Sequence, residues 1–422
     1  MDKQLLKQIL RDNQQEVVRY VIEAREFNFS TFPCWVLVGV RRSGKSYMLY
    51  QCIQQLLQEG KQWDEMLYLN FEDERLENFT AEDFNNLLEC HLEMYGKRPM
   101  LFLDEIQNID HWEKFARRMA DSKYTICITG SNAKMLSGEI NTTLGGRFLT
   151  SEIYPYSFRE YANVHRVSLL PNDMLSTEGR AAVLRCFNEY LHDGGLPASA
   201  LMNGKRNYLS SVFQKIYLGD IIARNNITNI ASIRVMIRKI AESVCRPISF
   251  NRIKNLLSSV GGKLSLATTI KYVEYCEEAW LLMRLRNYTS CLADKECNCK
   301  YYFIDNGILN LFLIDKDAML LENLVALQLF RKYGHDMDNE RVFFYNENFE
   351  VDFYIPEEKL AIQVCYSLRD EETLNRELDA LKKLPKRLEC SRRIILSFDE
   401  ETTFTDQHGT IEVIPCWKWM LD

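Results

Sequence analysis

The sequence lacks any apolar run long enough to cross a lipid bilayer, and its first residues lack the apolar segment of a signal peptide. The first absence argues against an integral α-helical membrane protein, and together they lead us to expect a cytoplasmic protein. The 13 cysteines are an odd number and lie mostly in apolar segments, which predicts reduced core residues. A chain of 422 residues, 46% of them hydrophobic, is long enough for two to four domains.

The sequence is also poor in histidine, with six in all. Cys291, Cys297 and Cys299 lie close together, with Cys276 upstream, but no histidine is nearby. Their spacing does not follow a zinc-knuckle pattern. We therefore interpret this cluster as a loop with incidental thiols.

The most informative stretch that is present is residues 39–46, which match the phosphate-binding pattern G-x-x-x-x-G-K-[ST], the P-loop. A short apolar run at 34–38 predicts a buried strand before it. Apolar residues with helical spacing over 47–57 predict a helix after it. A strand, a glycine-containing loop and a helix form the context that the motif requires, so we expect a nucleotide site here.

Each polar residue of the P-loop has an expected role. Gly39 and Gly44 let the backbone wrap close to phosphate oxygens, where N–H groups and a helix N-terminus favour negative charge. Lys45 is expected to reach the β- and γ-phosphates, and the Ser46 hydroxyl to bind Mg²⁺. The residues expected to contact the nucleotide are Gly39, Val40, Arg41, Arg42, Ser43, Gly44, Lys45, Ser46 and Tyr47.

A second apolar run, residues 99–105, ends in the carboxylates Asp104 and Glu105. The interval after the P-loop leaves room for a helix, another strand at 66–71 and a further helix. A buried strand that ends in Asp104 would deliver a Mg²⁺ ligand beside the P-loop. Glu105 would polarise the attacking water as general base. The alternative is a strand end whose acids simply face solvent.

Two further features are candidates for nucleotide sensing. A third strand, predicted at 124–132, ends in Ser131 and Asn132, either of which would sense a γ-phosphate or position water. A plain strand-to-loop turn would explain the same residues. Arg147, on the glycine-rich segment 144–148, would approach a γ-phosphate in its own subunit or in a neighbour's. A surface or structural arginine is the alternative.

On these motifs the chain resembles the prokaryotic AAA-type ATPases that carry a C-terminal domain of unknown function with a nuclease-like end. The resemblance covers most of the chain, and its N-terminal motifs imply ATP as the nucleotide. It is carried by residues 38–46, 102–107, 129–133, 146–147, 154–161, 190–197 and the final third of the sequence.

From about residue 173 to 288, helical patterns dominate. Two helices, at 249–257 and 265–276, flank a turn at Gly261–Gly262, and a strand is predicted at 280–285. Together they resemble a winged helix.

The charge of this region differs from that of the whole chain. Between Ser232 and Tyr288 there are ten basic and four acidic side chains, whereas the whole chain carries −7. Arg252, Lys254, Lys263 and Lys271 fall near the predicted turn and second helix. A basic patch on an acidic protein is an electrostatic footprint for nucleic-acid phosphates. A purely structural lid remains the alternative.

The last third alternates strands and helices and resembles the restriction-endonuclease-like fold. In that family a helix glutamate, a strand aspartate and a Glu-x-Lys pair gather round Mg²⁺, and Glu322 and Asp352 match the first two positions. Gln363 and Cys365 stand where the Glu-x-Lys pair is expected. Losing a charged metal ligand and a cation weakens transition-state stabilisation, so we expect a degenerate domain without efficient cleavage.

The resulting fold class is α/β: a P-loop parallel sheet with flanking helices, a helical winged-helix-like region and a small α/β nuclease-like domain. The expected domains are residues 1–165, 166–290 and 291–422. The expected function is ATP hydrolysis with ATP and Mg²⁺ as ligands, coupled to the C-terminal domains. Three classes remain open: a switch or motor on DNA, an ATP-dependent nuclease, and a signalling or scaffolding ATPase with protein partners. The oligomeric state is also open, and a homo-oligomer is one expectation.

Overall fold

The structure is a computed structural model of the full sequence, and it describes residues 1–29, 32–136, 138–260, 264–288, 291, 295, 297–335 and 340–421. The chain divides into two compact units, Met1–Ile153 and Tyr154–Asp422. Each unit has its own β-sheets and apolar core.

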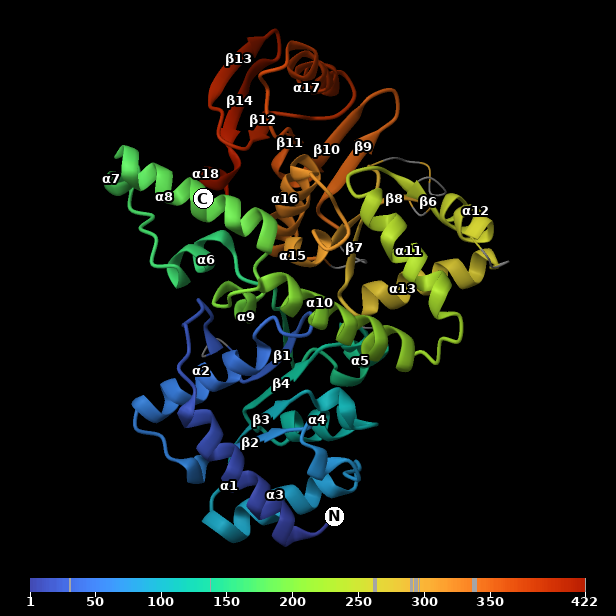
Figure 1. Ribbon diagram of the computed structural model, residues 1–422. Helices are drawn as coiled ribbons and strands as arrows, with labels where there is room; N and C mark the ends of the chain where they lie inside the picture. Colours follow the sequence, from blue (N-terminus) through green and yellow to red (C-terminus); the bar gives the residue numbers. More distant parts are fainter. Residues whose placement is uncertain are drawn as a thin grey trace. The chain divides into compact units, whose positions relative to one another are not determined.

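The first unit is built on a five-stranded parallel sheet with the strand order β2-β3-β4-β1-β5 (Figure 1). Strands β1 to β4 are short apolar runs, as expected for strands that are buried on both faces. The strands are β1 (Cys34–Val38), β2 (Met66–Asn70), β3 (Met100–Asp104), β4 (Ile126–Gly130) and β5 (Leu149–Glu152). The parallel sheet predicted for the N-terminal part is therefore confirmed.

Helices cover the two faces of this sheet. One core contains Leu37 of β1, Tyr68 of β2 and Phe102 of β3, together with apolar residues of α2. Because parallel crossovers are right-handed and the chain reverses direction across the sheet after β2, α3 and α4 lie on the other face. There the rings of Phe84 and Phe115 stack, with 4.1 Å between their centroids. The helices are α1 (Lys3–Arg19), α2 (Lys45–Gln58), α3 (Asp83–Tyr95), α4 (Trp112–Asp121) and α5 (Gly138–Leu144).

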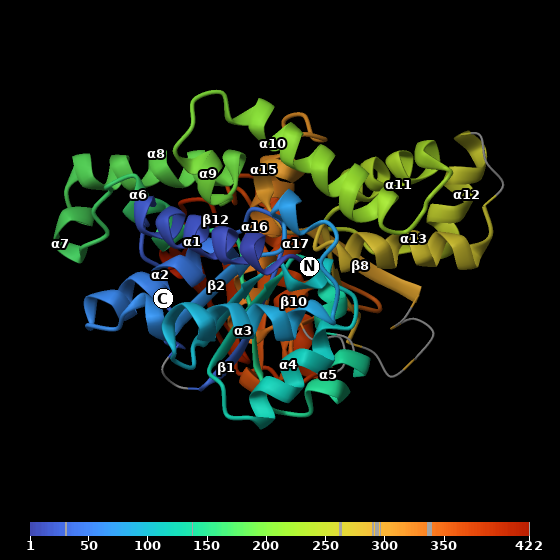
Figure 2. The same ribbon diagram turned by 90° about the horizontal axis from the view of Figure 1, so that it is seen from below.

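The second unit begins with helices and continues with a small sheet. The helices are α6 (Phe158–Val164), α7 (Pro171–Met174), α8 (Thr177–Asp193), α9 (Pro197–Ala200), α10 (Lys205–Lys215), the π-helical η6 (Ile216–Ala223), α11 (Ile230–Glu242), α12 (Phe250–Val260) and α13 (Leu266–Glu278). Figure 2 shows α11, α12 and α13 grouped together. The predicted turn at Gly261–Gly262, and Lys263 after it, lie outside the described residues.

An antiparallel three-stranded sheet of order β6-β8-β7 accompanies these three helices. Its strands are β6 (Ile248–Ser249), β7 (Leu282–Leu285) and β8 (Asn298–Phe303). The sequence predicts the strand near Tyr301 as part of the C-terminal α/β core, but the structure pairs it with β6 and β7. The apolar run identifies a strand, whereas its partners are set by contacts distant in sequence.

A six-stranded sheet of order β13-β14-β12-β11-β10-β9 completes the second unit, with α16 and α17 packed on it (Figure 1). Its strands are β9 (Phe343–Asn346), β10 (Glu350–Ile355), β11 (Leu360–Val364), β12 (Arg392–Ser397), β13 (Thr402–Asp406) and β14 (Gly409–Pro415). The helices around it are α15 (Asn306–Leu309), α16 (Asp317–Tyr333), α17 (Glu371–Lys383) and α18 (Cys416–Trp419). Strands β13 and β14 were not anticipated, because β13 lies at the edge of the sheet and is rich in threonine with little buried apolar surface.

No helix among the described residues combines the length and the apolar character that a membrane span requires.

Edge strand β13 pairs with β14 through its backbone, and a largely buried ion pair adds a side-chain contact to β12. The Arg393 side chain on β12 is 1% exposed, and its guanidinium donates two hydrogen bonds to Asp406, at 2.7 and 2.8 Å. This bidentate pairing holds the pKa of Asp406 at about 2. On the same sheet, Arg392 and Glu412 form an exposed pair at 3.6 Å.

We predict that Asp406→Ala destabilises the second unit by about 3 kcal/mol, because it leaves the buried Arg393 charge without its carboxylate partner. Glu412→Ala is the matched control and should cost less than about 1 kcal/mol, since its pair is exposed. Urea unfolding followed by circular dichroism measures both. Because the folded pKa of Asp406 is depressed, its contribution is present above about pH 4 and is lost as the pH falls toward 2. Equal shifts for the two variants would contradict this prediction.

Candidate functional site

The P-loop lies at the carboxyl end of β1, between Val38 and the first turn of α2. Gly44 precedes that helix with a φ of 98°, a left-handed conformation that favours glycine. Gly39 passes so close to the chain after β5 that a Cβ atom would lie 2.2 Å from the Ile153 carbonyl oxygen. The two motif glycines are therefore required by the backbone path of the loop.

Lys45 is buried at the centre of this loop, with 3% of its surface exposed. Its ammonium group donates to the carbonyl oxygens of Gly39 and Val40, each at 3.1 Å. It also lies 3.5 Å from a carboxylate oxygen of Glu105. The structure thus brings the predicted phosphate-binding lysine and the predicted general base into direct contact.

Asp104 ends β3, which is separated from β1 by β4 alone. Its carboxylate accepts hydrogen bonds from the hydroxyls of Thr129 and of Tyr68, the latter at 3.1 Å. It also interacts with the Ser46 hydroxyl. Because the carboxyl ends of neighbouring parallel strands meet at one edge, the two predicted Mg²⁺ ligands, Ser46 and Asp104, lie side by side.

The environments of the two acids push their pKa values in opposite directions. Burial and the neighbouring charge of Glu105 raise the pKa of Asp104 to about 6. Burial would also raise the pKa of Glu105, but Lys45 and the Gln107 amide outweigh it and lower that pKa. Glu105 is therefore held as the carboxylate that a general base requires.

Gln107 and Thr129 are parts of the site that the sequence analysis missed. The Gln107 amide donates to Glu105 at 2.6 Å and to the Ser131 hydroxyl at 3.3 Å. The Thr129 hydroxyl accepts the backbone N–H of Glu105 at 2.8 Å, and Glu105 has a left-handed φ of 51°. Such a conformation costs a non-glycine residue of order 1–3 kcal/mol and is sustained by surrounding contacts. The sequence feature that could have indicated Gln107 and Thr129 is their position close to the ends of predicted strands.

The remaining predicted residues differ in their placement. Ser131 is buried in the site, whereas the side-chain oxygen of Asn132 caps a local turn by accepting the Lys134 N–H at 2.9 Å. Arg147 forms an ion pair with Asp121 and donates to nearby backbone carbonyls. Among the described contacts of Arg147, none is with the P-loop.

The outer part of the P-loop is more exposed. Arg41 pairs with Glu72 after β2, and Arg42 has a left-handed φ of 68°. Tyr47, at the start of α2, is 43% exposed, and its ring lies 5.2 Å from that of Tyr20. The Ser43 hydroxyl is buried and has no hydrogen-bond partner among the residues that the structure describes. An orphaned buried donor in a phosphate-binding loop is consistent with a ligand oxygen as its missing partner.

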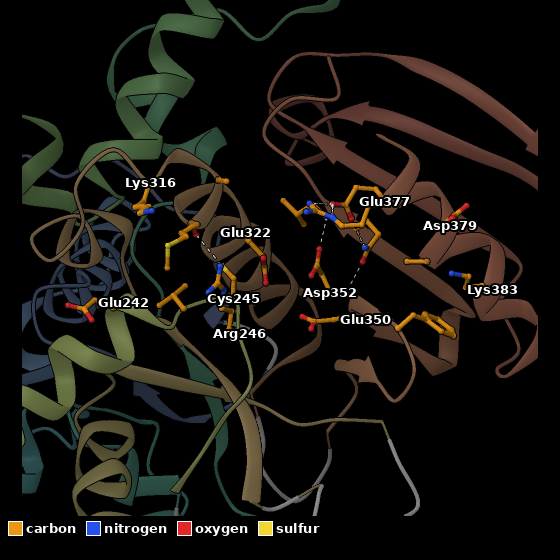
Figure 3. Close-up of a pocket in the computed structure, with 18 residues that line it drawn as sticks. Glu242, Cys245, Arg246, Lys316, Glu322, Glu350, Asp352, Glu377, Asp379 and Lys383 are labelled. Atoms are coloured by element: carbon orange, nitrogen blue, oxygen red, sulfur yellow. Dashed lines mark hydrogen bonds and ion pairs between the residues drawn. The ribbon is translucent and has the colours of Figure 1, made fainter. Parts of the chain in front are cut away.

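The candidate residues of the second unit also converge. Glu322 of α16, Asp352 of β10 and Gln363 of β11 line a cavity of about 720 Å³ (Figure 3). Cys365 does not line it and lies in an apolar core instead. Within the described residues, no group of three or more histidine, cysteine, aspartate or glutamate side chains is arranged to hold a metal ion.

Comparisons with known proteins agree with this geometry. A family model described as an AAA domain matches residues 31–162, and a model described as a domain of unknown function matches residues 184–318. An uncharacterized protein of Methanocaldococcus jannaschii is 35% identical over 437 residues, covering 100% of this chain and 96% of that protein. An uncharacterized protein of Haemophilus influenzae is 32% identical over 345 residues, covering 79% and 82%.

Among solved structures, a Walker-type ATPase of Pyrococcus abyssi is similar with a TM-score of 0.42 and 12% identity, covering 74% of this chain and 96% of that one. The long alignments with the two uncharacterized proteins show the family, and the AAA match identifies the kind of domain that contains the P-loop. The chain belongs to the family of these archaeal and bacterial proteins, and its P-loop unit carries an AAA-type, nucleotide-binding domain.

Proposed function

We propose that the protein hydrolyses ATP at the P-loop site of its first unit and passes the nucleotide state to its second unit. The observation that carries the proposal is the contact between Lys45 and Glu105, 3.5 Å apart, beside Asp104 and Ser46. One edge of the sheet thereby brings together a cation for the phosphates, a base for water and two oxygen ligands for a metal. These are the parts that phosphoryl transfer to water needs.

The residues at this edge fit a nucleotide with Mg²⁺. The Ser46 hydroxyl and the Asp104 carboxylate are hard oxygen donors of the kind that Mg²⁺ prefers, and Ser43 offers a buried hydroxyl. When bound, Mg²⁺ would neutralise charge on the phosphate oxygens. Lys45 at present donates to two carbonyls of its own loop, and phosphate oxygens would replace those acceptors.

Glu105 is the proposed base, and Gln107 and Ser131 position it. The amide of Gln107 bonds to one oxygen of Glu105, and Lys45 lies against the other. The lowered pKa keeps Glu105 ionised, so that it can take a proton from a water molecule aligned with the γ-phosphate. Ser131 and Asn132, at the end of the next strand, are proposed to sense that phosphate.

We predict that Glu105→Gln keeps ATP affinity and loses turnover by about 10²-fold or more, because the amide retains the shape but cannot accept the proton. Lys45→Ala should instead lower ATP affinity by about tenfold or more. A fluorescent-nucleotide titration and a phosphate-release assay measure the two effects. Glu59→Gln, the same chemical change at the exposed C-terminal end of α2, is the control and should turn over as wild type. A wild-type rate in folded Glu105→Gln would place the base elsewhere.

Arg147 is proposed to complete the site of a neighbouring subunit. Its ion pair with Asp121 holds it on the surface of its own unit, 33% exposed, where a second copy of the chain can meet it. In this arrangement the rate of hydrolysis depends on assembly.

Arg147→Ala should therefore lose turnover while keeping ATP affinity, and the wild-type rate per subunit should rise with protein concentration. Mixing Arg147→Ala with Lys45→Ala should restore activity, because one shared interface then has both residues. Arg117→Ala is a matched control, since Arg117 also approaches Asp121, at 3.9 Å. A concentration-independent rate without rescue would mean that each subunit hydrolyses ATP alone.

For the second unit we propose a winged-helix-like module followed by a degenerate nuclease-like core. The order α11, β6, α12, α13, β7, β8 with the sheet order β6-β8-β7 supports the first. The order α16, β9, β10, β11, α17, β12 and the convergence of Glu322 and Asp352 support the second. The proposed extents are 1–165 for the ATPase domain, 166–290 for the helical and winged-helix-like region and 291–422 for the nuclease-like core, and β8, which falls within the last, contributes its pairing with β6 and β7 to the winged-helix-like module. The proposed partner is DNA, held through the basic helices and not cut.

If DNA is the partner, Lys254→Glu and Lys271→Glu should each weaken its binding and lower the salt dependence by about one counterion, while basal ATP hydrolysis stays unchanged. Lys386→Glu makes the same charge change outside the α11–α13 group and should have little effect. Fluorescence anisotropy of a labelled duplex over a salt series measures this. Absence of DNA binding even at low salt would favour a scaffolding ATPase with protein partners, and metal-dependent cleavage would favour an ATP-dependent nuclease.

A further inference from the structure

Beside the cavity of the second unit, a lysine ammonium group is enclosed by three carboxylates. Lys300 lies on β8 and is fully buried. Its Nζ atom is 2.8 Å from Glu350, 3.1 Å from Asp352 and 3.2 Å from Glu322. An ammonium group has three N–H donors, and here each has a carboxylate acceptor within hydrogen-bond distance.

The other lone pairs of these carboxylates are largely taken by the protein itself. Asp352 accepts the backbone N–H of Val364 at 2.9 Å with its second oxygen. The oxygen of Glu322 that faces Lys300 also accepts the Tyr302 hydroxyl at 2.7 Å. Asp352 therefore has a donor on each oxygen, and the Glu322 oxygen that faces Lys300 has two donors.

Gln363 is fixed in a structural role as well. Its amide oxygen accepts the backbone N–H of Asp352 at 2.7 Å, and its amide nitrogen donates to Glu377 of α17 at 2.6 Å. A glutamate in its place could not donate to Glu377 and would repel it. The glutamine therefore suits a network of hydrogen bonds better than a set of metal ligands.

Charge explains why the cluster needs a cation at its centre. Burial and the nearby Asp352 raise the pKa of Glu322 to about 7. Burial would lower the pKa of Lys300, but Glu322, Asp352 and Glu350 outweigh it and hold that pKa well above its ordinary value. Without the ammonium group, the buried acids would repel one another and take up protons. In nuclease-like sites this compensation is the task of a divalent metal.

We propose that Lys300 is the resident cation of this cluster: its ammonium group takes the place of a divalent metal between Glu322 and Asp352 and keeps metal out. The proposal rests on the nuclease-like reading of the second unit given above. The residues do not fit the metal that this fold implies, because a fixed positive charge already satisfies them. Removing that charge should uncover a latent site for a hard divalent cation such as Mn²⁺, with Glu322, Glu350 and Asp352 as oxygen ligands.

The test is Mn²⁺ binding to the nucleotide-free full chain, followed by electron paramagnetic resonance of free Mn²⁺. Wild type and Asp352→Asn should give the same titration, because neither binds Mn²⁺ at the cluster. Lys300→Ala should gain one site that binds at least about tenfold more tightly than any in wild type. That site should vanish in Lys300→Ala combined with Asp352→Asn. The control Lys332→Ala removes an exposed lysine from α16 and should titrate as wild type.

Two results would overturn the proposal: a wild-type Mn²⁺ site that is lost in Asp352→Asn, or a folded Lys300→Ala protein that binds no more Mn²⁺ than wild type. If Lys300→Ala does not fold in buffer, Mn²⁺ should restore its cooperative melting, and failure to do so counts against the proposal. The comparison of wild type with Asp352→Asn tests the proposal even if Lys300→Ala does not fold, because both of these proteins retain Lys300.

A DNA cleavage assay on the same samples separates this inference from the proposed function. If wild type binds Mn²⁺ through Asp352 but cuts no DNA, the proposal that Lys300 takes the place of a metal is wrong, whereas the expectation that the domain does not cleave DNA holds. If wild type cuts DNA with Mn²⁺ and Asp352→Ala abolishes cutting, both are wrong. ATP hydrolysis by the first unit should be unchanged in the Lys300 and Asp352 variants.

Discussion

A buried lysine charge must be compensated within the protein, and this requirement shapes both units. Lys45 and Lys300 are each almost wholly removed from water, and an isolated ammonium group in that position would be prohibitively unfavourable. Both form ion pairs with carboxylates: Glu105 follows β3, Glu350 and Asp352 lie on β10, and Glu322 lies on α16. The two lysines differ in the groups that surround their ammonium groups. Among the described residues, Lys45 forms one ion pair and donates to two carbonyls that a phosphate can replace, whereas Lys300 forms ion pairs with three carboxylates.

That difference is the basis for the different roles proposed for the two sites. Near Lys45, the Ser43 hydroxyl has no described hydrogen-bond partner and the backbone of Glu105 is strained. Each feature lowers the stability of the fold, as is common at functional sites. Around Lys300, the Tyr302 hydroxyl donates to Glu322, the Val364 N–H donates to the Asp352 carboxylate, and the Gln363 amide oxygen accepts the Asp352 N–H. Where such a network is satisfied, it rigidifies a core and favours one arrangement of the chain.

The sequence predicted the first unit well, because its signals are local. The motif at 39–46 and the apolar runs before and after it determine a strand, a loop and a helix in direct succession. The contributions of Gln107 and Thr129 could not be predicted, because they depend on how strand ends meet in space. Lys300 was missed for the same reason: a lysine that opens the run Tyr301–Tyr302–Phe303 gives a hint of burial, but its partners lie 22, 50 and 52 positions further on.

The position of Lys300 on β8 has a mechanical consequence. β8 is the central strand of the three-stranded sheet beside α11–α13, while Glu350 and Asp352 belong to β10 of the six-stranded sheet. Rotating one sheet against the other would separate the ammonium group from its carboxylates and leave unpaired charges in a buried environment. We therefore expect β8 and the adjoining part of the larger sheet to move together.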